Sequence, residues 1–568
     1  MLRWLFKELP DTESVQRLQQ ALKVDEIVAT LLLQRGITAY DQAKTFFRPA
    51  TEQLLDPYLM KGMTEAVPRI LSAIENGQRI MVYGDYDVDG TTSVALVFQF
   101  LKKLTDNIEY YIPDRYSEGY GISFAGIDTA HDNGVSLIIA LDCGIRSVDK
   151  VAYATQKGID FIICDHHLPA DEIPAAVAVL DPKQADCPYP FKELSGCGIG
   201  FKLCQALCIA KELPIAEALQ YADLVATSIG ADIVPITGEN RVLAFLGLEL
   251  INSNPGVGIK TILQFNNIKK KLSISDVVFI IAPRINAAGR IAHGSNAVKL
   301  LISPDQLSAD EFNQIIHFNN IERKNLDTNI TQEALEMMAT DDTFLNKKST
   351  VLYSPTWHKG VVGIVASRVI EKYYRPTIVL TESNGKATGS ARSVRDFDVH
   401  QAITACSDLL EQFGGHKYAA GLTMKLENVE AFRTKFEEVV SSSILDEMLI
   451  PSQEIDVEIS LEQITPKLMR ILKQIGPYGP GNMQPVFLTR NLLNKGEARI
   501  VGQNHLKLEV YSETQKDFTF PAIFFKALDY LPIVQSGNPF DMIYTIEENE
   551  FNGQITLQLV VKGLRQVI

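Results

Sequence analysis

Cysteine is scarce in this sequence of 568 residues, which holds seven cysteines and no Cys-x-x-Cys pair. A sparse and odd-numbered set argues against a disulfide framework, and the missing pair argues against a zinc ribbon. We therefore expect buried free thiols in a reducing compartment.

Long hydrophobic runs are missing as well. The longest runs, such as VSLIIAL from Val135, have the length of a strand, whereas a membrane span needs about 20 apolar residues. The N-terminal segment MLRWLFKELPD has no apolar core of the length found in signal peptides. The sequence predicts a cytoplasmic protein without membrane contact.

Positively charged residues are fewer than negatively charged ones: the chain has 54 lysines and arginines and 69 aspartates and glutamates, for a formal net charge of −15. Proteins that hold nucleic acid over a broad surface are usually basic, so this balance alone argues against such a partner. The stretch 358–395 nevertheless holds seven lysines and arginines and two acidic residues, a local net of +5. Any nucleic-acid site should therefore be a narrow, locally positive cleft with weak affinity for duplex DNA.

Length and hydrophobic patterning divide the chain into several segments, in keeping with roughly 150 residues per domain. We expect an N-terminal helical extension (1–65) that packs on the next domain, an α/β domain (66–304), a connecting helix (305–345), a second α/β domain (346–448) and a strand-rich C-terminal domain (449–568). Alternating runs in the last segment, such as HLKLEVY and ITLQLVV, predict a small antiparallel barrel.

Short apolar runs separated by helical patterns fill the first α/β segment. They are RIMVY (79–83), IEYYI (108–112), VSLIIAL (135–141), FIIC (161–164) and VAVL (177–180). This alternation predicts a doubly wound parallel sheet that is buried on both faces. Ligands of such sheets bind beyond the carboxyl ends of the strands, so the residues after each run are the first candidates for a site.

Acidic and histidine residues follow three of these runs. GDYDVDG supplies Asp85, Asp87 and Asp89, LDCG supplies Asp142, CDHH supplies Asp165, His166 and His167, and the apolar stretch TSIGADIVPI adds Asp232. Each motif alone fits a turn, a helix cap or a surface pair, and D-x-D-x-D-G also occurs in calcium loops. Leu96 stands where an EF-hand would have its glutamate, however, which disfavours that alternative.

Carboxylates at neighbouring strand ends would converge and repel one another unless a counter-charge lies between them. Divalent cations are the simplest counter-charge. Oxygen ligands with imidazole and no thiolate suit Mn²⁺ or Mg²⁺, and the histidine favours Mn²⁺.

A pair of such ions about 3.5–4 Å apart is typical of enzymes that hydrolyse phosphate esters. Phosphoryl transfer also needs groups that bind the charged oxygens. The candidates are Arg284, Asn286 and Arg290 in APRINAAGR, Ser390, Arg392 and Arg395 in SARSVR, and Gly414, Gly415 and His416 in GGH.

The ordered motifs GDYDVDG, LDCG, CDHHLP and ADIVP resemble the DHH phosphoesterase superfamily. HKGVVGIVASR, GSARS and FGGHKYAAG resemble its DHH-associated C-terminal domain. APRINAAGR and YIPDRYSEGYG are similar to those of one branch, the RecJ single-strand-specific exonucleases, and the strand-rich tail resembles that branch's OB-fold domain.

This resemblance implies 5′→3′ degradation of single-stranded DNA to 5′-mononucleotides in recombination and repair. It implies two divalent cations, held by Asp85, Asp87, Asp89, Asp142, His166 and Asp232, with Asp142 bridging them. His167 and Asp165 would be catalytic. The strand would be bound by Arg115, Tyr120, Arg284, Asn286, Arg290, His358, Ser390, Arg392, Gly414, Gly415 and His416. A single-strand-binding protein and a repair helicase are the implied partners of a monomer.

The sequence departs from the superfamily at one position. Many members carry a histidine four residues before the first paired aspartate, where this chain has Tyr83. Asp85 is the expected substitute ligand.

Two other functions remain open from the sequence. One is a phosphodiesterase of the same superfamily that acts on short oligonucleotides or cyclic dinucleotides, which would not need the C-terminal barrel. The other is an inactive nucleic-acid-binding scaffold, which the complete set of core ligands disfavours.

Overall fold

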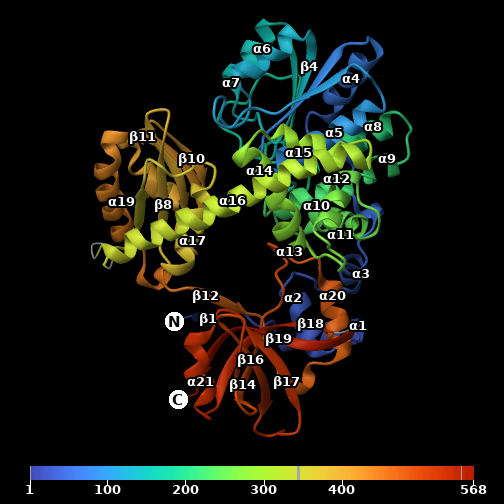
Figure 1. The fold of residues 1–568 in the computed structure, drawn as a ribbon. Coiled ribbons are helices and arrows are strands. Elements are labelled where there is room, and N and C mark those ends of the chain that lie inside the picture. Colours follow the sequence, from blue (N-terminus) through green and yellow to red (C-terminus); the bar gives the residue numbers. More distant parts are fainter. Residues whose placement is uncertain (1, 342–343, 345, 552, 568) are drawn as a thin grey trace. The chain divides into compact units, whose positions relative to one another are not determined.

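The computed structural model describes residues 2–567, apart from 342, 343, 345 and 552. The chain forms two compact units, and many of their helices and strands are labelled in Figure 1. One consists of Asp41–Glu322 and Lys473–Gln484, and the other of Met1–Tyr40, Arg323–Leu472 and Pro485–Ile568.

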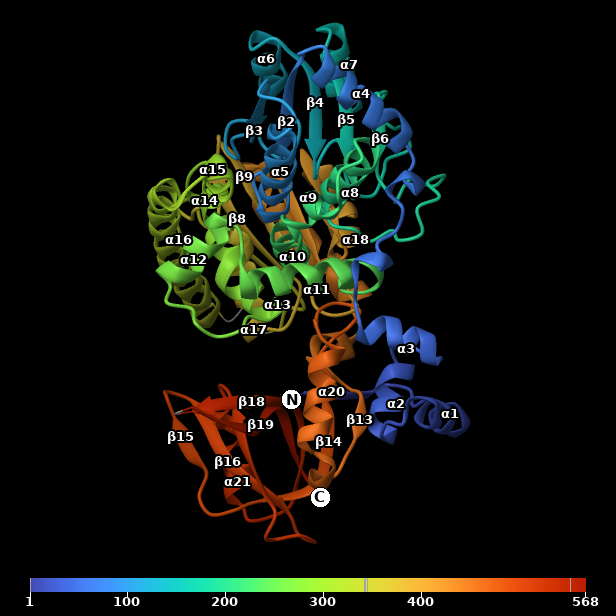
Figure 2. The same cartoon turned by 90° about the vertical axis from the view of Figure 1, so that its right-hand side faces the viewer.

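The first unit is built on a five-stranded parallel sheet of order β3-β2-β4-β5-β6 (Figure 2). Its strands are β2 (Arg79–Gly84), β3 (Ile108–Tyr111), β4 (Val135–Leu141), β5 (Asp160–Cys164) and β6 (Ala178–Leu180). Helix α4 (Met63–Glu75) precedes β2, and the helices between successive strands are α5 (Val88–Lys102), α6 (Phe124–Asp132) and α7 (Val148–Gln156). The five apolar runs are therefore the five strands, as predicted.

Both faces of this sheet are buried. Ile80 and Val82 of β2 belong to one hydrophobic cluster, and Met81 and Tyr83 of the same strand belong to another. Successive side chains of a strand point to opposite faces, so the two clusters cover the two sides of the sheet. This arrangement explains why the strands are apolar at every position.

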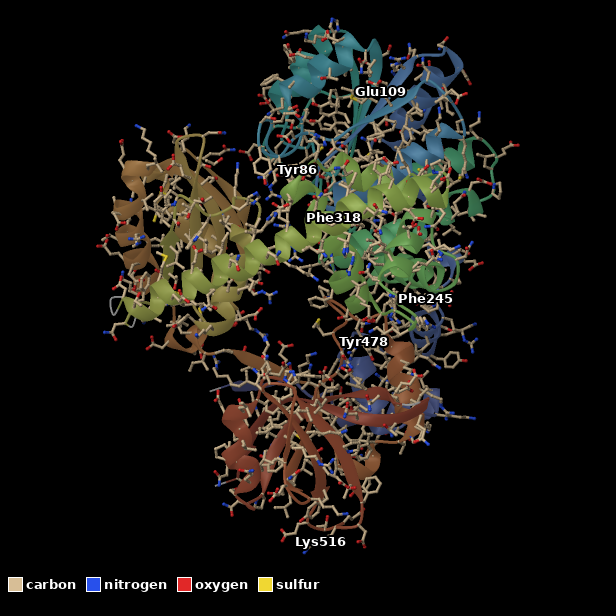
Figure 3. The ribbon with its side chains drawn as sticks, viewed as in Figure 1. Tyr86, Glu109, Phe245, Phe318, Tyr478 and Lys516 are labelled. Atoms are coloured by element: carbon tan, nitrogen blue, oxygen red, sulfur yellow. The ribbon has the colours of Figure 1, made fainter. Side chains whose placement is uncertain are left out.

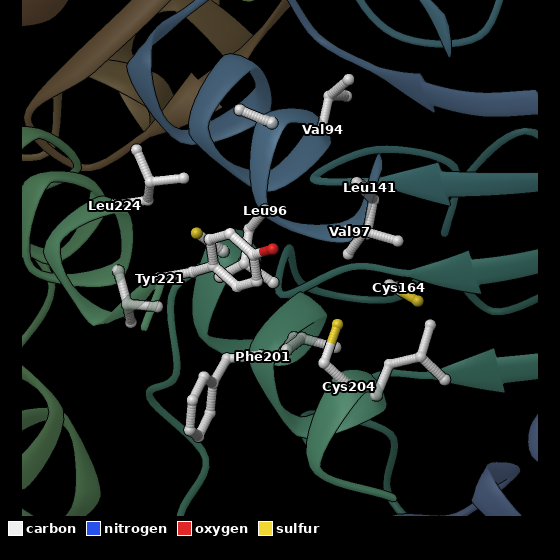
Figure 4. Packing of buried hydrophobic residues seen from close by; sticks show 14 of the residues in the cluster. Val94, Leu96, Val97, Leu141, Cys164, Phe201, Cys204, Tyr221 and Leu224 are labelled. Carbon is white, nitrogen blue, oxygen red and sulfur yellow. The ribbon is translucent and has the colours of Figure 1, made fainter. Parts of the chain in front are cut away.

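Helices α5 and α8 (Gly196–Ala210) pack on one face of the sheet. Val97, Leu141, Cys164, Phe201 and Cys204 lie in this fully buried cluster (Figure 4). Burying each large side chain contributes about 1.5–3 kcal/mol. All seven cysteines are free and buried, as expected.

Further helices complete the first unit. They are α3 (Tyr40–Phe47), α9 (Ala216–Leu219), α10 (Ala222–Ala231), α11 (Gly238–Ser253), α12 (Val257–Phe265), α13 (Ile274–Asp276), the π-helix η3 (Val277–Ile281), α14 (Ala282–Ile291) and α15 (Ser295–Leu301). The predicted connecting helix is α16 (Gln306–Thr340), whose sequence contains no proline or glycine. In the part of the chain that the structure describes, no single helix could span a membrane, although the bent pair α11 and α12 meets the length and composition criteria.

The second α/β domain contains a mixed five-stranded sheet of order β10-β11-β9-β8-β7. Its strands are β7 (Thr350–Tyr353), β8 (Thr377–Ser383), β9 (Lys386–Arg392), β10 (Gln412–His416) and β11 (Ala419–Lys425). Its helices are α17 (Val362–Lys372), α18 (Val399–Thr404) and α19 (Val429–Ser443). Only β7 and β8 pair in parallel.

The C-terminal strands close into a barrel. Its elements are β13 (Val457–Glu458), α20 (Pro466–Ile475), β14 (Phe487–Asn494), β15 (Arg499–Val501), β16 (His505–Ser512), β17 (Thr519–Phe524), α21 (Leu531–Gln535), β18 (Phe540–Phe551) and β19 (Gln554–Gln566). The ring closes because β14 pairs with both β18 and β16. The barrel was expected to be antiparallel, but β17 and β19 pair in parallel.

The N-terminal region was expected to be helical and to pack on the domain that follows it. It contains α1 (Thr12–Leu22) and α2 (Glu26–Leu33), but it begins with a strand, β1 (Arg3–Phe6). This strand pairs in parallel with β12 (Ser452–Ile455), so residues up to Tyr40 belong to the unit that contains the barrel. The packing expectation was therefore wrong for this part.

A segment in the expected C-terminal domain belongs to the first unit instead. Pro480 O accepts a hydrogen bond from Ile236 N at 2.7 Å, and Arg241 Nη1 donates to Ile475 O at 2.8 Å. The Arg241 guanidinium also lies 3.8 Å from the ring centre of Phe46. The hydrogen bonds attach Lys473–Gln484 to Ile236 and α11, and α3 packs against the same arginine through Phe46.

Candidate metal centre and substrate-binding residues

The predicted acidic residues follow three neighbouring strands at one edge of the sheet. Gly84 of β2 pairs with Leu141 of β4, and Leu141 pairs with Cys164 of β5. Asp85, Asp142 and Asp165 are the next residues along the chain. The register of the sheet therefore brings these three carboxylates to the same edge.

His166 lies among three carboxylates. Its Nε2 is 3.2 Å from Asp142 Oδ1, 3.5 Å from Asp232 Oδ2 and 3.7 Å from Asp89 Oδ2. Asp232 reaches this cluster from the end of α10, and Asp89 from the first turn of α5. Among the residues that the structure describes, two groups bring ligand atoms close enough to hold a cation: Asp89 with His166 and Asp232, and Asp142 with His166 and His167.

The cluster contains buried polar atoms with no hydrogen-bond partner among the described residues, including Asp85 Oδ2 and His166 Nδ1. Leaving such an atom unsatisfied costs about 1–3 kcal/mol. Carboxylate oxygens and imidazole nitrogens that are buried without partners fit a site for Mn²⁺ or Mg²⁺.

The pKa values of several aspartates in the cluster are raised, because burial and neighbouring negative charges disfavour the ionised carboxylate. Burial, followed by the charges of Asp89 and Asp87, raises the pKa of Asp142 well above its ordinary value. Burial and the charge of Asp87 do the same to the pKa of Asp85. Burial and the charge of Asp89 raise the pKa of Asp232 to about 8. A divalent cation would relieve this repulsion.

Asp87 and Asp89 are fixed by the start of α5. Asp87 Oδ1 caps this helix by accepting a hydrogen bond from Gly90 N at 3.0 Å. Asp89 Oδ2 accepts from Gly196 N at 2.7 Å and Oδ1 accepts from Cys197 N at 2.8 Å. The amides at the N-terminus of α8 therefore hold the Asp89 carboxylate.

Ser228 is a functional candidate that the sequence reasoning missed. Its hydroxyl lies 2.7 Å from Asp89 Oδ1 and 2.6 Å from the Ser195 hydroxyl, which caps α8. Gly196 is required at the same place, because a Cβ there would lie 2.7 Å from Asp142 Cβ. The motif LSGCGIG and the serine of TSIGAD are the only local signals for this support.

Asp142 has a strained backbone with a φ of 59°. This left-handed conformation costs an ordinary residue about 1–3 kcal/mol and is found preferentially at functional positions.

Asp165 and His167 form a hydrogen-bonded pair. His167 Nδ1 lies 2.7 Å from Asp165 Oδ1, and Asp165 Oδ2 accepts from Ile145 N at 2.9 Å. Burial opposes ionisation of both groups, but their mutual contact lowers the pKa of Asp165 to about 2 and raises the pKa of His167 to about 9. His167 Nε2 lies 3.2 Å from the Tyr120 hydroxyl.

Tyr83 is part of the hydrophobic core. Its hydroxyl donates to Gly121 O and accepts from Ser123 N, each at 3.1 Å, and its ring stacks on Tyr111 with centroids 5.2 Å apart. Asp85 Oδ1 accepts a longer hydrogen bond of 3.3 Å from Gly121 N. Asp85 as the substitute ligand stays a prediction.

The strand-binding candidates Arg115, Tyr120 and Arg290 form a second group. The Arg115 guanidinium lies 4.9 Å from the ring centre of Tyr86, which meets Tyr120 edge-on at 6.1 Å. The backbone of α14 touches Tyr86, since a Cβ on Gly289 would lie 2.4 Å from Tyr86 O. Tyr116 donates its hydroxyl proton to the carbonyl of Arg290.

Two candidates on α14 differ in their surroundings. Asn286 is half-buried on this helix. Arg284 donates to Ile280 O and, at 2.5 Å, to Asn266 Oδ1. Neither acceptor belongs to the cluster around His166.

The remaining candidates lie in the other unit, on β9, on β10 and before α17. Ser390 of β9 and Gly414 of β10 both pair with Gly421 of β11, while Arg392 and His416 both pair with Ala419. Gly415 lies between Gly414 and His416 on β10. The sheet register therefore groups these residues across three strands.

The side chains around Arg392 are interconnected. Arg392 Nη1 donates to Ser390 Oγ at 2.7 Å. A Cβ on Gly363 of α17 would lie 2.9 Å from Arg392 Nη2. His358 Nδ1 accepts from Gly360 N at 3.1 Å, in the loop before α17. Arg395 instead forms an ion pair with Glu454.

Three family models match the chain. They are the DHH family N-terminal domain over residues 79–229, the DHHA1 domain over residues 346–442 and the RecJ OB domain over residues 455–563.

Curated relatives cover nearly the whole chain. The single-stranded-DNA-specific exonuclease RecJ of Bacillus subtilis is 37% identical over 566 residues, which are 99% of this chain and 70% of that protein. The Escherichia coli RecJ is 33% identical over 527 residues, which cover 89% and 90% of the two chains. The crystal structure of Thermus thermophilus RecJ in complex with Mn²⁺ matches with a TM-score of 0.84 and 28% identity, over 100% of this chain and 80% of that one. The chain belongs to the RecJ family of single-stranded-DNA-specific exonucleases.

Proposed function

We propose that this chain degrades single-stranded DNA from its 5′ end and releases 5′-mononucleotides, in recombination and repair. Membership of the RecJ family and the Asp/His cluster at the sheet edge support this proposal. The observation that carries it is the position of His166 Nε2 within 3.7 Å of oxygens from Asp89, Asp142 and Asp232.

Two divalent cations are the proposed cofactors, with Mn²⁺ preferred and Mg²⁺ as an alternative. Their proposed ligands are Asp85, Asp87, Asp89, Asp142, His166 and Asp232, with Asp142 between the two ions. Thermus thermophilus RecJ has been crystallised with each of these metals, which supports the choice. When bound, such ions lower the pKa of an attacking water and neutralise charge on the phosphate.

His167 is the proposed donor to the scissile phosphate. Its contact with Asp165 raises its pKa to about 9, so the imidazole is protonated at neutral pH and positions Nε2–H as a donor. Asp165 orients the ring and stabilises its charge, as carboxylates do for histidines in hydrolases.

The strand is proposed to be held by two groups of residues. In the first unit these are Arg115, Tyr120, Arg284, Asn286 and Arg290, and in the other unit they are His358, Ser390, Arg392, Gly414, Gly415 and His416. The Arg392 guanidinium, whose Nη1 already donates to Ser390, offers further N–H donors for a phosphate. A single-strand-binding protein and a repair helicase are the proposed partners.

The experiment is digestion of long single strands labelled at the 5′ or the 3′ end, in Mn²⁺, Mg²⁺ or EDTA. We expect labelled mononucleotide at once from the 5′ label, late release from the 3′ label, and no product in EDTA. Immediate release of the 3′ label would overturn the direction. Faster cleavage of dinucleotides or cyclic dinucleotides than of long strands would instead favour the small-substrate alternative.

Asp89→Ala gives the matched test of the metal assignment. We expect it to abolish release of nucleotides in every metal while circular dichroism shows a folded protein. Undiminished activity in a chelated and Mn²⁺-restored sample of this variant would refute the ligand assignment.

A further inference from the structure

Exposed aromatic rings gather where α12, η3 and the first half of α16 meet. Phe265 at the end of α12 is 45% exposed, Phe279 in η3 is 74% exposed, and Phe318 on α16 is 67% exposed. Phe318 is labelled in Figure 3. None of these elements supplies a residue of the proposed metal site. Large apolar side chains exposed together mark interaction surfaces.

The rings on α12 and α16 form a continuous series. The ring centroids of Phe265 and His317 are 4.8 Å apart, and those of His317 and Phe318 are 6.1 Å apart. The interplanar angles are 60° and 63°, so the rings are inclined to one another, and the exposed rings at the two ends of the series are those of Phe265 and Phe318. An exposed aromatic ring is what stacking on a nucleobase requires.

Arg284 connects this series to Phe279. Its guanidinium donates to Asn266, the residue after Phe265, and to the carbonyl of Ile280, the residue after Phe279. The half-buried guanidinium thus lies between the chain segments that carry Phe265 and Phe279. Arginine stacks on bases and binds phosphate, so it suits both parts of a nucleotide.

The local charge is opposite to that of the whole chain. Residues 260–290 hold six lysines and arginines and one aspartate, a net of +5 in a chain of net −15. Three of these, Lys269, Lys270 and Lys271, are consecutive and exposed just beyond the end of α12. On α16, Glu311 and Glu322 are exposed, so a phosphate backbone would follow the lysine side of the rings.

We propose that this aromatic–basic surface, made of Phe265, Phe279, Arg284, His317, Phe318 and Lys269–Lys271, stacks the bases of single-stranded nucleic acid outside the metal centre. The inference rests on the proposed function, since it deepens how that activity selects its substrate. Bases in a duplex are stacked on one another and do not offer their faces, so the surface binds single strands in preference to duplexes. A second copy of the chain is a poorer occupant, because a symmetric pairing would bring the two lysine triplets together.

Binding can be measured without hydrolysis by fluorescence anisotropy of labelled oligothymidylate in EDTA. Stacking of one base contributes about 1–3 kcal/mol. We therefore expect Phe265→Ala/Phe318→Ala to weaken the binding of long strands by about tenfold or more. Phe6→Ala, which also removes an exposed phenylalanine, is the matched control and should bind as the unaltered protein does.

An abasic strand separates stacking from phosphate contacts. The unaltered protein should bind abasic strands more weakly than normal strands, and the double variant should show a smaller difference. Phe318→Trp gives a direct signal, because stacked bases quench tryptophan emission and the chain has only two other tryptophans. We expect this variant to be quenched by oligothymidylate and not by duplex DNA.

Equal affinity of the double variant and the unaltered protein would overturn the inference. So would a loss of self-association in the double variant with unchanged DNA binding, since the surface would then join two copies. The proposed function fails separately, if the unaltered protein releases no nucleotide from any single strand in Mn²⁺. Thermal unfolding of each variant verifies that the loss is not one of folding.

Discussion

The Nδ1 atom of His167 lies 2.7 Å from Oδ1 of Asp165, and the opposite ring nitrogen lies 3.2 Å from the hydroxyl of Tyr120. Asp165 is buried, and it accepts hydrogen bonds from the backbone amides of Ile145 and His166 as well. The Asp165 carboxylate is thus held in place at the end of β5, and it orients the imidazole of His167. The same contact keeps His167, the residue proposed to face the phosphate, protonated.

Asp165→Asn tests this link through the pH dependence of the reaction. The carboxylate keeps His167 protonated up to its pKa of about 9, so activity of the unaltered protein should fall as the pH rises through that value. Without the negative charge the pKa of His167 should move toward its ordinary value of about 6.5. The alkaline limb of kcat should therefore shift to lower pH.

At neutral pH the same variant should lose about 10²-fold or more in kcat, the range for a positioned proton donor. Asp149→Asn, which alters an exposed carboxylate on α7, is the control and should keep the original profile. An unchanged alkaline limb in Asp165→Asn would show that His167 does not carry this ionisation.

Ser228→Ala tests how the metal ligand Asp89 is held. The Ser228 hydroxyl is 2.7 Å from Asp89 Oδ1, and its loss leaves that oxygen with the amide of Cys197 at 2.8 Å and the hydroxyl of Ser93 at 3.5 Å. Groups that orient metal ligands contribute about 10–100-fold in metal affinity or activity. We expect a higher Mn²⁺ concentration for half-maximal activity, with a smaller change in kcat at saturating Mn²⁺.

Thr227→Val is the matched control for that experiment. Thr227 precedes Ser228 on α10, and its buried hydroxyl donates to the carbonyl of Asp223 instead. The Mn²⁺ requirement of this variant should match that of the unaltered protein. Equal Mn²⁺ curves for Ser228→Ala and Thr227→Val would rule out the positioning role.

Lys202→Met should destabilise the first unit. Lys202 Nζ lies 2.7 Å from Glu239 Oε1, and both side chains are fully buried. Glu239 also accepts from Leu55 N at 3.0 Å and from the Tyr189 hydroxyl. Removing one partner of a buried pair leaves an uncompensated charge, which costs about 3–5 kcal/mol.

The measurement is urea unfolding followed by a probe of the first unit. The double variant Lys202→Met/Glu239→Gln removes both charges and should recover most of the stability, since glutamine can still accept from Leu55 and donate to Tyr189. A double variant as unstable as Lys202→Met would show that lost packing, and not an unpaired charge, is responsible.

The position of the acidic residues at one edge of the sheet could be predicted, because it follows from local sequence patterns. The strands β2, β4 and β5 end directly before Asp85, Asp142 and Asp165, and parallel pairing aligns those ends by itself. The buried support of Asp89 could not be predicted in this way. Ser228 and Gly196 reach that carboxylate from α10 and α8, and only tertiary packing determines this approach.

Contacts between distant parts of the chain could not be predicted from the sequence either. The strand β1 is four residues long, and Arg3 pairs with Ser452. A run this short has no periodicity that identifies its partner. Nothing in the sequence around Arg241 likewise indicates that its side chain binds backbone carbonyls of Lys473–Gln484. Side-chain-to-backbone contacts of this kind leave no pattern in either segment.

The stability of the metal-free protein should depend on pH through the crowded carboxylates. Asp142 and Asp85 have pKa values well above the ordinary value near 3.8, so between that value and their raised values the folded state binds more protons than the unfolded state. Stability is therefore greatest at low pH within this window and falls as the pH rises. Asp232 contributes less, because 33% of its side chain is exposed to solvent.

Thermal unfolding in EDTA at pH 6 and pH 9 should accordingly give a lower Tm at pH 9, through ionisation of groups such as Asp232, whose pKa is about 8. Mn²⁺ should reduce the difference in Tm, since it replaces the protons as counter-charge, and at 100 times its Kd it stabilises the folded state by about 2.7 kcal/mol.

Asp142→Asn should lose most of the rise in Tm that Mn²⁺ causes. In EDTA at pH 9 this variant should unfold at a higher temperature than the unaltered protein. Asparagine tolerates the left-handed backbone at this position, so strain does not confound the comparison. Asp132→Asn, an exposed change on α6, should respond to Mn²⁺ as the unaltered protein does. An equal Mn²⁺ increment in Asp142→Asn would mean that the ions bind elsewhere.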